Sequence, residues 1–318
     1  MEKSEPILDY GPFRGYRVPV AVARDLCERE GLPRPRRLVR IMRGEVNASF
    51  RLDFDDADPL ILKVWVRTSD PERMRHAESV ARQLRERTGV PTPAWIHQSP
   101  ADDLIDYPYA LQELAGGEDA DEAWPGFSRR TKDAFMEECG LVLREMHESG
   151  IDVPGPVDAQ AWADEDLTRF AHAVEQLHDQ AWMPRAMLDR AARLWERNSS
   201  LLQEAGGLSF VHYDFQPHNL RVEPVSGRIV SVLDLDNSTR GPAFSDVRDL
   251  LLTVFVPDPG SAEPFWRAYG PVDEQRRMIL RLHSLARVLD VLWAYAGPAP
   301  EGWNHTTVAT LLEDMETA

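Results

Sequence analysis

The sequence is poor in cysteine and has no long apolar run. Cys27 and Cys139 are the two cysteines among 318 residues, and they lie too far apart to indicate a disulfide framework or a zinc site. No uncharged apolar stretch approaches the roughly 18 residues that a membrane-spanning helix needs. The first residues show neither a basic start nor an apolar run, so we expect no secretory signal. These absences favour a cytoplasmic protein.

Positive charge is also scarce. Lys and Arg number 36 against 53 Asp and Glu, which gives a formal net charge of −17. Because nucleic acids and anionic membranes are held by clustered Lys and Arg, we expect neither as a partner. The balance favours a cationic small molecule. Asp164, Glu165 and Asp166 are among the acids that such a molecule would meet, but we interpret this triplet first as a helix start, which acidic residues stabilise.

The segment from His212 to Asn219 reads H-Y-D-F-Q-P-H-N and is the most informative part of the chain. In a kinase catalytic loop of spacing H-x-D-x-x-x-x-N, the Asp accepts the hydroxyl proton and the Asn holds Mg²⁺. A hairpin pattern follows, and its second strand ends at Asp234 and Asp236. Carboxylates at the end of such a strand are costly without a cation, which a divalent metal supplies. The spacing predicts a phosphotransferase active site.

These residues resemble the aminoglycoside phosphotransferase and choline kinase family of small-molecule kinases. The resemblance also rests on the run Gly241–Asp246, which reads G-P-A-F-S-D. It implies an α+β, bilobal, protein-kinase-like fold. The N-terminal lobe is expected to be small, mainly antiparallel β and to carry one key helix, and the C-terminal lobe to be larger and mainly helical.

The resemblance also assigns roles to residues of the catalytic segment. Asp214 is implied as the catalytic base, Asn219 and Asp234 as Mg²⁺ ligands, and Asp236 as a further candidate near the metals. Asp246 is expected to be structural. Tyr213 stands where the family often has Gly, which bears on the substrate more than on the reaction.

We expect the nucleotide-binding lobe in residues 1–114 and the catalytic and acceptor-binding lobe in residues 115–318. Within the first, the apolar strand 60–66 carries a single lysine, Lys63, and a charge in such a strand needs a partner. In kinases the partners are the α- and β-phosphates and a Glu of the next helix. That helix is predicted after Asp70-Pro71, and by resemblance its Glu78 pairs with Lys63.

The other nucleotide contacts are less strongly indicated. The pattern G-x-G-x-x-G is missing, and Gly44 alone lies in the hairpin predicted between apolar stretches 37–42 and 49–54. Asn47 and Ser49 are candidates to donate to phosphate, although Asn in a hairpin is commonly there for its backbone. By resemblance, Glu113 and Leu114 present backbone groups to the nucleobase.

The rest of the chain is predicted to be mainly helical. By resemblance, the helices around residues 160 to 200 are expected to form the acceptor pocket. Amphipathic spacing and turn signals place the predicted helices at 131–149, 167–178, 187–200, 273–296 and 307–315.

We therefore expect a Mg²⁺-dependent kinase that moves the γ-phosphoryl group of ATP or GTP to a hydroxyl of a small cationic molecule, such as an aminoglycoside antibiotic. One alternative is a metabolic kinase of the same fold that acts on choline, homoserine, a sugar or a glycated amine. Another is an inactive nucleotide-binding scaffold, against which the intact set of Lys63, Asp214, Asn219 and Asp234 argues. A protein kinase fits poorly, because no A-P-E motif follows the metal strand. The sequence does not predict the oligomeric state.

Overall fold

The computed structural model describes residues 15–42, 47–180, 183–295 and 304–317. They separate into two compact units, which are described one at a time. Among the described residues, the sheet unit holds Gly15–Gly117 together with Val230–Asp236, and the helical unit holds Glu118–Ile229 and the residues from Asn237 onward. The lobe division expected between residues 114 and 115 stays a prediction. The sequence did not indicate that Val230–Asp236 joins the sheet unit. None of the helices in the described ranges is long and apolar enough to cross a membrane.

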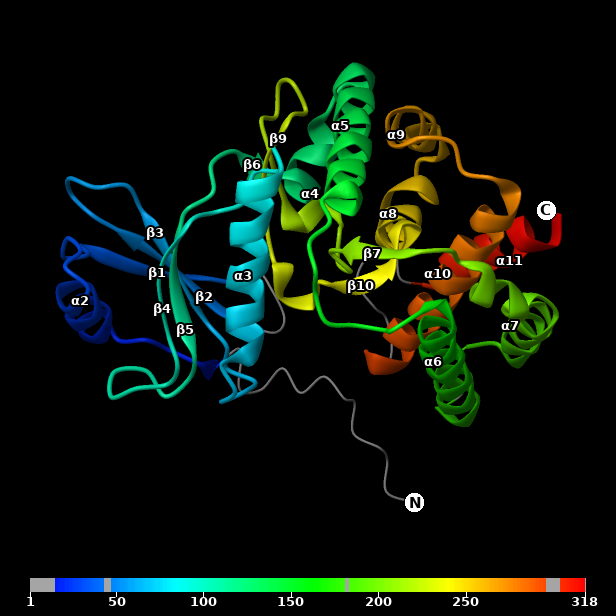
Figure 1. Ribbon diagram of the computed structural model, residues 1–318, viewed down its shortest axis with the longest axis horizontal. Coiled ribbons are helices and arrows are strands. Elements are labelled where there is room, and N and C mark those ends of the chain that lie inside the picture. The colour runs from blue at the N-terminus through cyan, green and yellow to red at the C-terminus, as the bar shows by residue number, and fades with distance from the viewer. Residues whose placement is uncertain (1–14, 43–46, 181–182, 296–303, 318) are drawn as a thin grey trace. The chain divides into compact units, whose positions relative to one another are not determined.

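The sheet unit is built on five antiparallel strands in the order β1-β2-β3-β5-β4 (Figure 1). The strands expected in stretches 37–42, 49–54 and 60–66 are present, while residues 43–46 of the predicted phosphate hairpin lie outside the described residues. The strands are β1 Arg37–Ile41, β2 Ala48–Asp53, β3 Leu60–Val64, β4 Trp95–Ser99 and β5 Tyr109–Glu113.

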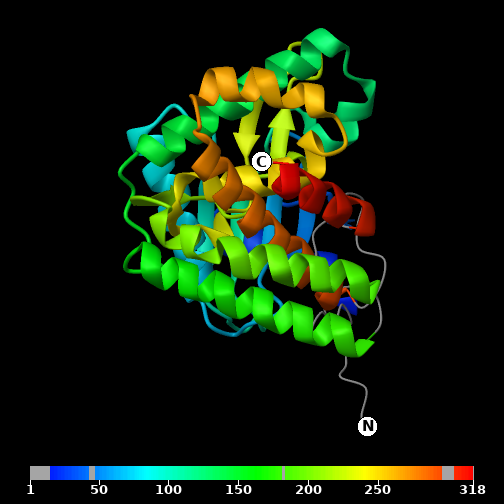
Figure 2. The ribbon, with the colours of Figure 1, turned by 90° about the vertical axis from the view of Figure 1, so that its right-hand side faces the viewer.

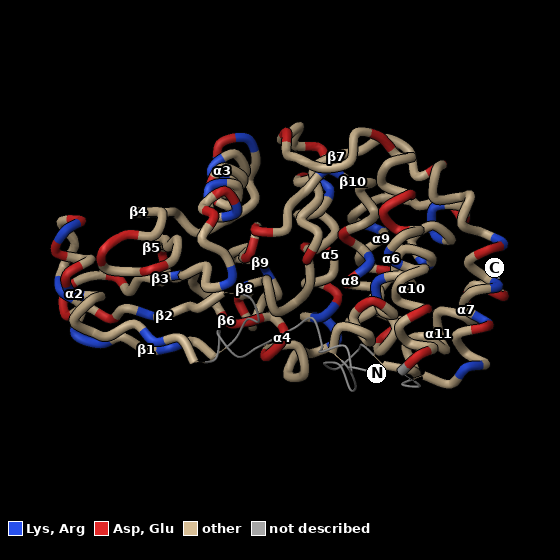
Figure 3. The backbone as a smooth tube through the Cα atoms, turned by 90° about the horizontal axis from the view of Figure 1, so that it is seen from below, with Lys and Arg blue, Asp and Glu red and all other residues tan. Residues whose placement is uncertain are grey.

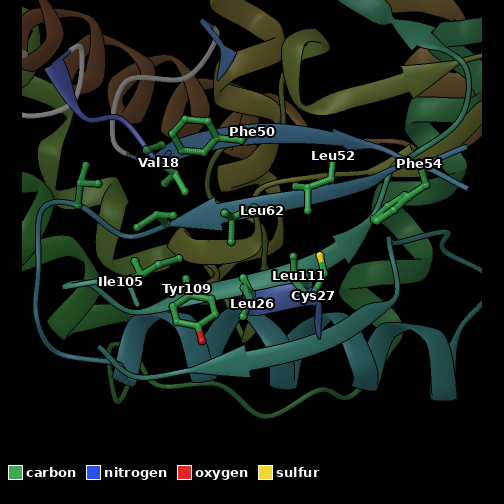
Figure 4. Packing of buried hydrophobic residues seen from close by; sticks show 13 residues of the cluster. Val18, Leu26, Cys27, Phe50, Leu52, Phe54, Leu62, Ile105, Tyr109 and Leu111 are labelled. Atoms are coloured by element: carbon green, nitrogen blue, oxygen red, sulfur yellow. The ribbon is translucent and has the colours of Figure 1, made fainter. Parts of the chain in front are cut away.

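One face of this sheet packs against helix α2, Val20–Arg29. Alternate strand residues point to the same face, so Phe50 and Leu52 of β2 meet Leu62 of β3 and, from the helix, Leu26 (Figure 4). All four are buried, and each apolar side chain of this size contributes about 1.5–3 kcal/mol when removed from water. The sequence analysis did not predict α2.

Helix α3, Glu72–Arg87, covers the opposite face (Figure 1). Asp70 accepts a hydrogen bond from the backbone N–H of Glu72 at 3.0 Å, in agreement with the predicted helix opening. The predicted stripe from Met74 to Leu84 is buried. Met74 packs with Ala110 and Trp65, and the indole of Trp65 stacks on that of Trp95 with ring centroids 5.9 Å apart.

The helical unit contains long helices joined by short strands and 3₁₀ turns. Helix α5 packs on α9, and α6 packs on α10 and lies beside α7 (Figure 2). The predicted helices are present, with boundaries that differ by a few residues except at the start of α6. The helices are α4 Ala120–Ala123, α5 Arg129–Glu148, α6 Ala159–Gln180, α7 Arg185–Asn198, α8 Val247–Leu250, α9 Ala262–Tyr269, α10 Glu274–Ala294 and α11 His305–Thr317.

The start of α6 corrects a prediction. The helix begins at Ala159, where the side chain of Asp158 accepts the N–H of Ala161 at 2.9 Å, so the acidic triplet 164–166 lies inside the helix. The interpretation of the triplet as a helix start was therefore wrong. Asp166 is 1% exposed and accepts hydrogen bonds from His283 and Arg169, which removes it from the solvent-facing acids.

Two small sheets frame the segment with the kinase-like spacing. Strand β7, Leu208–Val211, pairs with β10, Thr239–Pro242. Strand β8, Leu220–Val222, lies between β6, Glu118–Asp119, and β9, Ile229–Val232, and its pairing with β9 confirms the predicted hairpin. The segment from His212 to Asn219 thus runs from the end of β7 to the start of β8.

Candidate active site

The segment after β7 has an unusual backbone conformation. Tyr213 has φ +66°, in the left-handed region that bulky residues rarely adopt. The buried carboxylate of Asp246 accepts the N–H of His212 at 2.8 Å and that of Tyr213 at 2.6 Å. Arg248, also buried, donates to the carbonyl of Tyr213 at 3.2 Å. Both sides of the strained residue are therefore fixed by buried charged groups.

A histidine supports the charge of Asp246. Nε2 of His147 donates to Oδ2 of Asp246 at 3.0 Å, and Nδ1 of His147 lies 2.9 Å from the Tyr269 hydroxyl. Burial alone would raise the pKa of Asp246, but the hydrogen bond and charge of His147 and the donors at His212 hold this pKa below its ordinary value. Asp246 is ionised at neutral pH, and its contacts fit the structural role expected for it.

The structure brings Asp214 and Asn219 together. Oδ2 of Asp214 accepts a hydrogen bond from Nδ2 of Asn219 at 2.9 Å, and the Gln216 amide donates to Oδ1. Nδ2 of Asn219 also donates to the backbone carbonyl of Asp214 at 2.9 Å. Since the nitrogen of this amide serves the loop, its oxygen is the atom suited to a metal. Asn219 is 6% exposed, so its orientation is well defined.

A second cluster lies in the sheet unit. Nζ of Lys63 donates to Oδ1 of Asp234 and to Oδ1 of Asp236, both at 2.9 Å, and the lysine side chain is 12% exposed. Burial alone would lower the pKa of Lys63, but the two carboxylates raise it above its ordinary value. The lysine is therefore a fixed positive charge at any physiological pH.

The two aspartates differ in their surroundings. The side chain of Asp236 is 3% exposed, and its Oδ2 accepts from Nδ2 of Asn47 and Nε1 of Trp65, both at 2.7 Å. Metal binding by Asp236 stays a prediction, and it would require one of these donors to be displaced. Asp234 is 38% exposed and has φ +58°. Of the two, Asp234 is the carboxylate that a ligand can reach.

The structure does not show the predicted ion pair between Lys63 and Glu78, and a nucleotide-site role for Glu78 stays a prediction. Glu78, on α3, instead pairs with Arg82 one turn later, with 3.5 Å between its Oε1 and the arginine Nε. The reason is that Asp234 and Asp236 already neutralise Lys63. Ser49 is the strand partner of Lys63 on β2 and therefore shares its face of the sheet; phosphate binding by Ser49 stays a prediction.

The nucleobase contacts expected from Glu113 and Leu114 stay predictions, with one restriction. The N–H of Glu113 donates to the carbonyl of Ala94 at 2.9 Å, so this donor is already used within the sheet. The N–H of Leu114 makes a long bond of 3.4 Å to the carbonyl of Pro59. Leu114 is thus the better donor for an incoming base.

The candidate metal ligands have the chemistry that Mg²⁺ requires. Mg²⁺ binds oxygen atoms and usually combines one or two protein carboxylates with phosphate oxygens. The Asp234 carboxylate and the Asn219 amide oxygen fit that set. Within the part of the chain that the structure describes, no group of three or more His, Cys, Asp or Glu could hold a metal by itself. A metal completed by phosphates needs no such group.

Two residues of the site were missed by the sequence analysis. Trp65 donates to Asp236, but nothing in an apolar strand distinguishes this tryptophan from a core residue. Arg248 forms a fully buried ion pair with Asp249, with 2.9 Å between Nη2 and Oδ2. The signal for it was available, since an Arg-Asp pair directly before the apolar run Leu250–Leu252 indicates buried, paired charges.

Known proteins support the fold. The gentamicin complex of APH(2")-IIa superposes with a TM-score of 0.63 at 17% identity, covering 95% of this chain and 97% of that one. ADP-bound aminoglycoside phosphotransferase APH(2'')-Ib gives a TM-score of 0.62 at 18% identity, covering 92% of this chain and 96% of the other. The predicted α+β, kinase-like fold, with an antiparallel sheet region and a larger helical region, is confirmed.

Comparison with known sequences identifies the family of this chain. This chain is 24% identical over 259 residues to acyl-CoA dehydrogenase family member 10 of Mus musculus; the match covers 75% of this chain and 22% of the mouse protein. The chain thus spans about a fifth of that relative's length. The profile of the phosphotransferase enzyme family matches residues 37–281, which include Lys63, Asp214, Asn219 and Asp234. Since this match covers more than half of the chain, the protein belongs to the phosphotransferase enzyme family.

Proposed function

We propose that the protein transfers the γ-phosphoryl group of a nucleoside triphosphate to a hydroxyl group of a small molecule, with Asp214 as the base. The observation that carries this proposal is the orientation of Asp214. Its carboxylate is held by Asn219 and Gln216, in a loop whose strained residue is fixed by Asp246. A fixed orientation of the base favours phosphoryl transfer, because catalysis of this reaction depends on positioning and charge neutralisation.

The proposed reaction is a phosphoryl transfer to the acceptor hydroxyl. The acceptor oxygen forms a bond to the γ-phosphorus while the bond from that phosphorus to the β,γ-bridging oxygen breaks. The nucleoside diphosphate leaves with the electron pair of that bond, and the hydroxyl proton passes to Asp214. Lys63 binds the α- and β-phosphates, with Asn47 and Ser49 as further donors.

Asn219 and Asp234 would hold Mg²⁺. The metal supplies neutralisation of the charge that develops on the phosphate oxygens. For this role Asp234 must give up its bond to Lys63, which its exposure allows. Asp236 remains a candidate near the metals, subject to the displacement described above.

A nucleotide donor is supported by the ADP-bound structural neighbour, and Leu114 would donate to its base. The neighbour in complex with gentamicin and the net charge of −17 support a cationic hydroxyl acceptor such as an aminoglycoside. The match to part of a mouse protein named for acyl-CoA dehydrogenases favours testing metabolic alcohols as a second acceptor class. A cytoplasmic location and a role in antibiotic resistance belong to the same proposal.

The test is the Asp214→Asn variant, which keeps the shape of the side chain and removes the base. We expect kcat to fall about 10²–10⁴-fold, the range for loss of a general base, while the Kd for ADP stays close to that of the wild type. Turnover would be followed by the mass of the phosphorylated acceptor across a panel of aminoglycosides, choline, homoserine and sugars.

Glu223→Gln is the matched control, because it removes an exposed carboxylate from the turn after β8, outside the loop. It should turn over like the wild type. Full activity in Asp214→Asn would show that the base lies elsewhere. Nucleotide binding by the wild type without turnover of any acceptor would favour the inactive scaffold.

A further inference from the structure

We propose that Asp236 is the positioning residue that orients Lys63 toward the phosphates, the place that the sequence predicted for Glu78. The inference rests on the proposed function, in which Lys63 binds the α- and β-phosphates. It is supported by contacts within the sheet unit, where Val230–Asp236 returns to the sheet. It assigns Asp236 a role distinct from that of Asp234, two residues earlier.

The carboxylate of Asp236 is fixed by donors from separate segments. Oδ1 accepts from Lys63 on β3, and Oδ2 accepts from Asn47, just before β2, and from Trp65, just after β3. A carboxylate that is 3% exposed is stable only with paired charge and satisfied oxygens, and this set supplies both. The resulting geometry has little freedom to change when a ligand binds.

Asp234 contacts the same ammonium group but is more exposed to solvent than Asp236. It is 38% exposed, so solvent or a metal can reach its carboxylate. An ammonium group has three N–H donors. Once Asp234 turns to the metal, an ammonium anchored on Asp236 offers its other donors to phosphate oxygens. Asp236 is thus the permanent counter-ion, and Asp234 the exchangeable one.

Glu78 is poorly suited to this role. It is already paired with Arg82 on the same helix, and its side chain is 22% exposed. Asp236 also holds Nδ2 of Asn47, the predicted phosphate donor at the end of the hairpin. One buried carboxylate therefore holds both groups proposed to bind the phosphates, Lys63 and Asn47.

The indole of Trp65 completes the arrangement. Its ring is 1% exposed and stacks on Trp95, and Nζ of Lys63 lies 5.0 Å from the ring centroid. The ring thus borders the Lys63–Asp236 pair, and a charge pair shielded from water is stronger because water screens it less. Trp65 is the residue through which the pair can be perturbed without removing a charge.

The experiment measures the Kd for Mg-ADP by displacement of a fluorescent nucleotide, which needs no acceptor and no turnover. Asp236→Asn should weaken binding about 10–100-fold, because loss of the counter-ion changes the position of Lys63. Trp65→Phe, which removes a single donor and keeps an aromatic ring, should weaken it by about 3–10-fold. Glu78→Gln should weaken it less than either.

A double-mutant cycle separates positioning from a general structural effect. If Asp236 acts through Lys63, the double variant Lys63→Ala/Asp236→Asn should have a Kd within about threefold of that of Lys63→Ala alone. If the two residues act independently, the factors by which each substitution raises the Kd should multiply. Multiplying losses, or a larger loss in Glu78→Gln than in Asp236→Asn, would overturn the inference. If Asp236→Asn does not fold, Trp65→Phe carries the test through the same cycle with Lys63→Ala.

Failure of this inference is distinguishable from failure of the proposed function. A wild-type protein that binds no nucleotide would refute the proposed function itself. A wild-type protein that binds Mg-ADP, together with an Asp236→Asn variant that melts at the same temperature and binds equally well, would refute only the role of Asp236.

Discussion

Tyr213 and Asp234 are the non-glycine residues with positive φ in the described ranges, and the sequence analysis singled out both segments for function. One precedes the proposed base, and the other is a proposed metal ligand. Strained backbone of this kind costs about 1–3 kcal/mol and persists where surrounding contacts over-determine it. At Tyr213 the contacts are charged and buried, so the loop depends on the ionisation state of Asp246.

That dependence predicts how stability changes in acid. The pKa of Asp246 is lower in the folded protein than the ordinary value of about 3.9, so its carboxylate contributes stability above the unfolded pKa that is lost as pH falls through the folded pKa. Asp246→Asn should cost about 3–5 kcal/mol near neutral pH because it breaks a buried charged network. Urea unfolding of both proteins as a function of pH would show this cost shrinking in acid. A cost independent of pH would contradict the assigned charge.

The two cysteines give a simpler prediction. Burial raises the pKa of Cys27 to about 11 and that of Cys139 well above its ordinary value, so both are protonated thiols at neutral pH. Thiolates, not thiols, attack disulfide reagents. Neither cysteine should react with Ellman's reagent at pH 8 in the native protein, and both should react in guanidinium. Fast reaction of one thiol before denaturation would show that its burial is wrong.

At the scale of elements, amphipathic periodicity predicted the long helices well. The stripe of α5 lies on one face of the helix from Phe135 to Met146 and is buried as predicted. The start of α6 was missed because the cap is Asp158, just after Gly155-Pro156, while the acids at 164–166 resemble a first turn. Helix α2 was missed because it is short, with 10 residues, and its buried stripe consists of Ala23, Leu26 and Cys27 alone. Packing against the sheet, not local propensity, defines that helix.

The contact between α5 and α9 is close enough to test. A Cβ at Gly140 would lie 2.7 Å from the carbonyl oxygen of Phe265 and 2.9 Å from the backbone nitrogen of Tyr269, so the helices would have to separate. Gly140→Ala should therefore destabilise the protein by about 1–3 kcal/mol despite the higher helix propensity of Ala. Gly126→Ala is the control, because nothing lies within 4 Å of its Cβ. Equal thermal melting of both variants would contradict the packing.

At the scale of the whole molecule, the negative charge is distributed along the chain. Asp and Glu occur throughout the described elements, while α3 carries both signs along its length (Figure 3). The charge of −17 therefore acts on ligands mainly as a long-range field. Of the acidic triplet, Asp166 is buried against His283, while Asp164 and Glu165 are exposed.

The field predicts a salt dependence for the acceptor. For a polycationic acceptor, KM should rise several-fold between about 0.05 M and 0.5 M salt, because screening weakens attraction to an acidic protein. The KM of an uncharged hydroxyl acceptor should change much less, which makes it the control. Steady-state kinetics in both buffers measures the difference. If the two acceptors respond alike, the acceptor is not selected by charge.

The sequence predicted the residues of the candidate site better than their contacts. The kinase-like spacing predicted Asp214 and Asn219, and a single charge in an apolar strand predicted Lys63; their roles stay predictions. The partner of Lys63 was not predictable in this way. It depends on Val230–Asp236 joining a sheet formed by residues more than a hundred positions earlier, which no local pattern encodes.

That long-range return makes the sheet unit discontinuous along the chain, with a consequence for how the protein can be divided. A fragment ending at Gly117 would retain Lys63, Asn47 and Trp65 but lack Asp236, whose carboxylate accepts hydrogen bonds from all three. It would bury an unneutralised ammonium, so it is not expected to be an autonomous folding module. A peptide spanning residues 230–236, added in trans, would be the shortest segment able to restore the missing carboxylate. Recombination that exchanges only the N-terminal part between relatives would separate the three donors from their own Asp236.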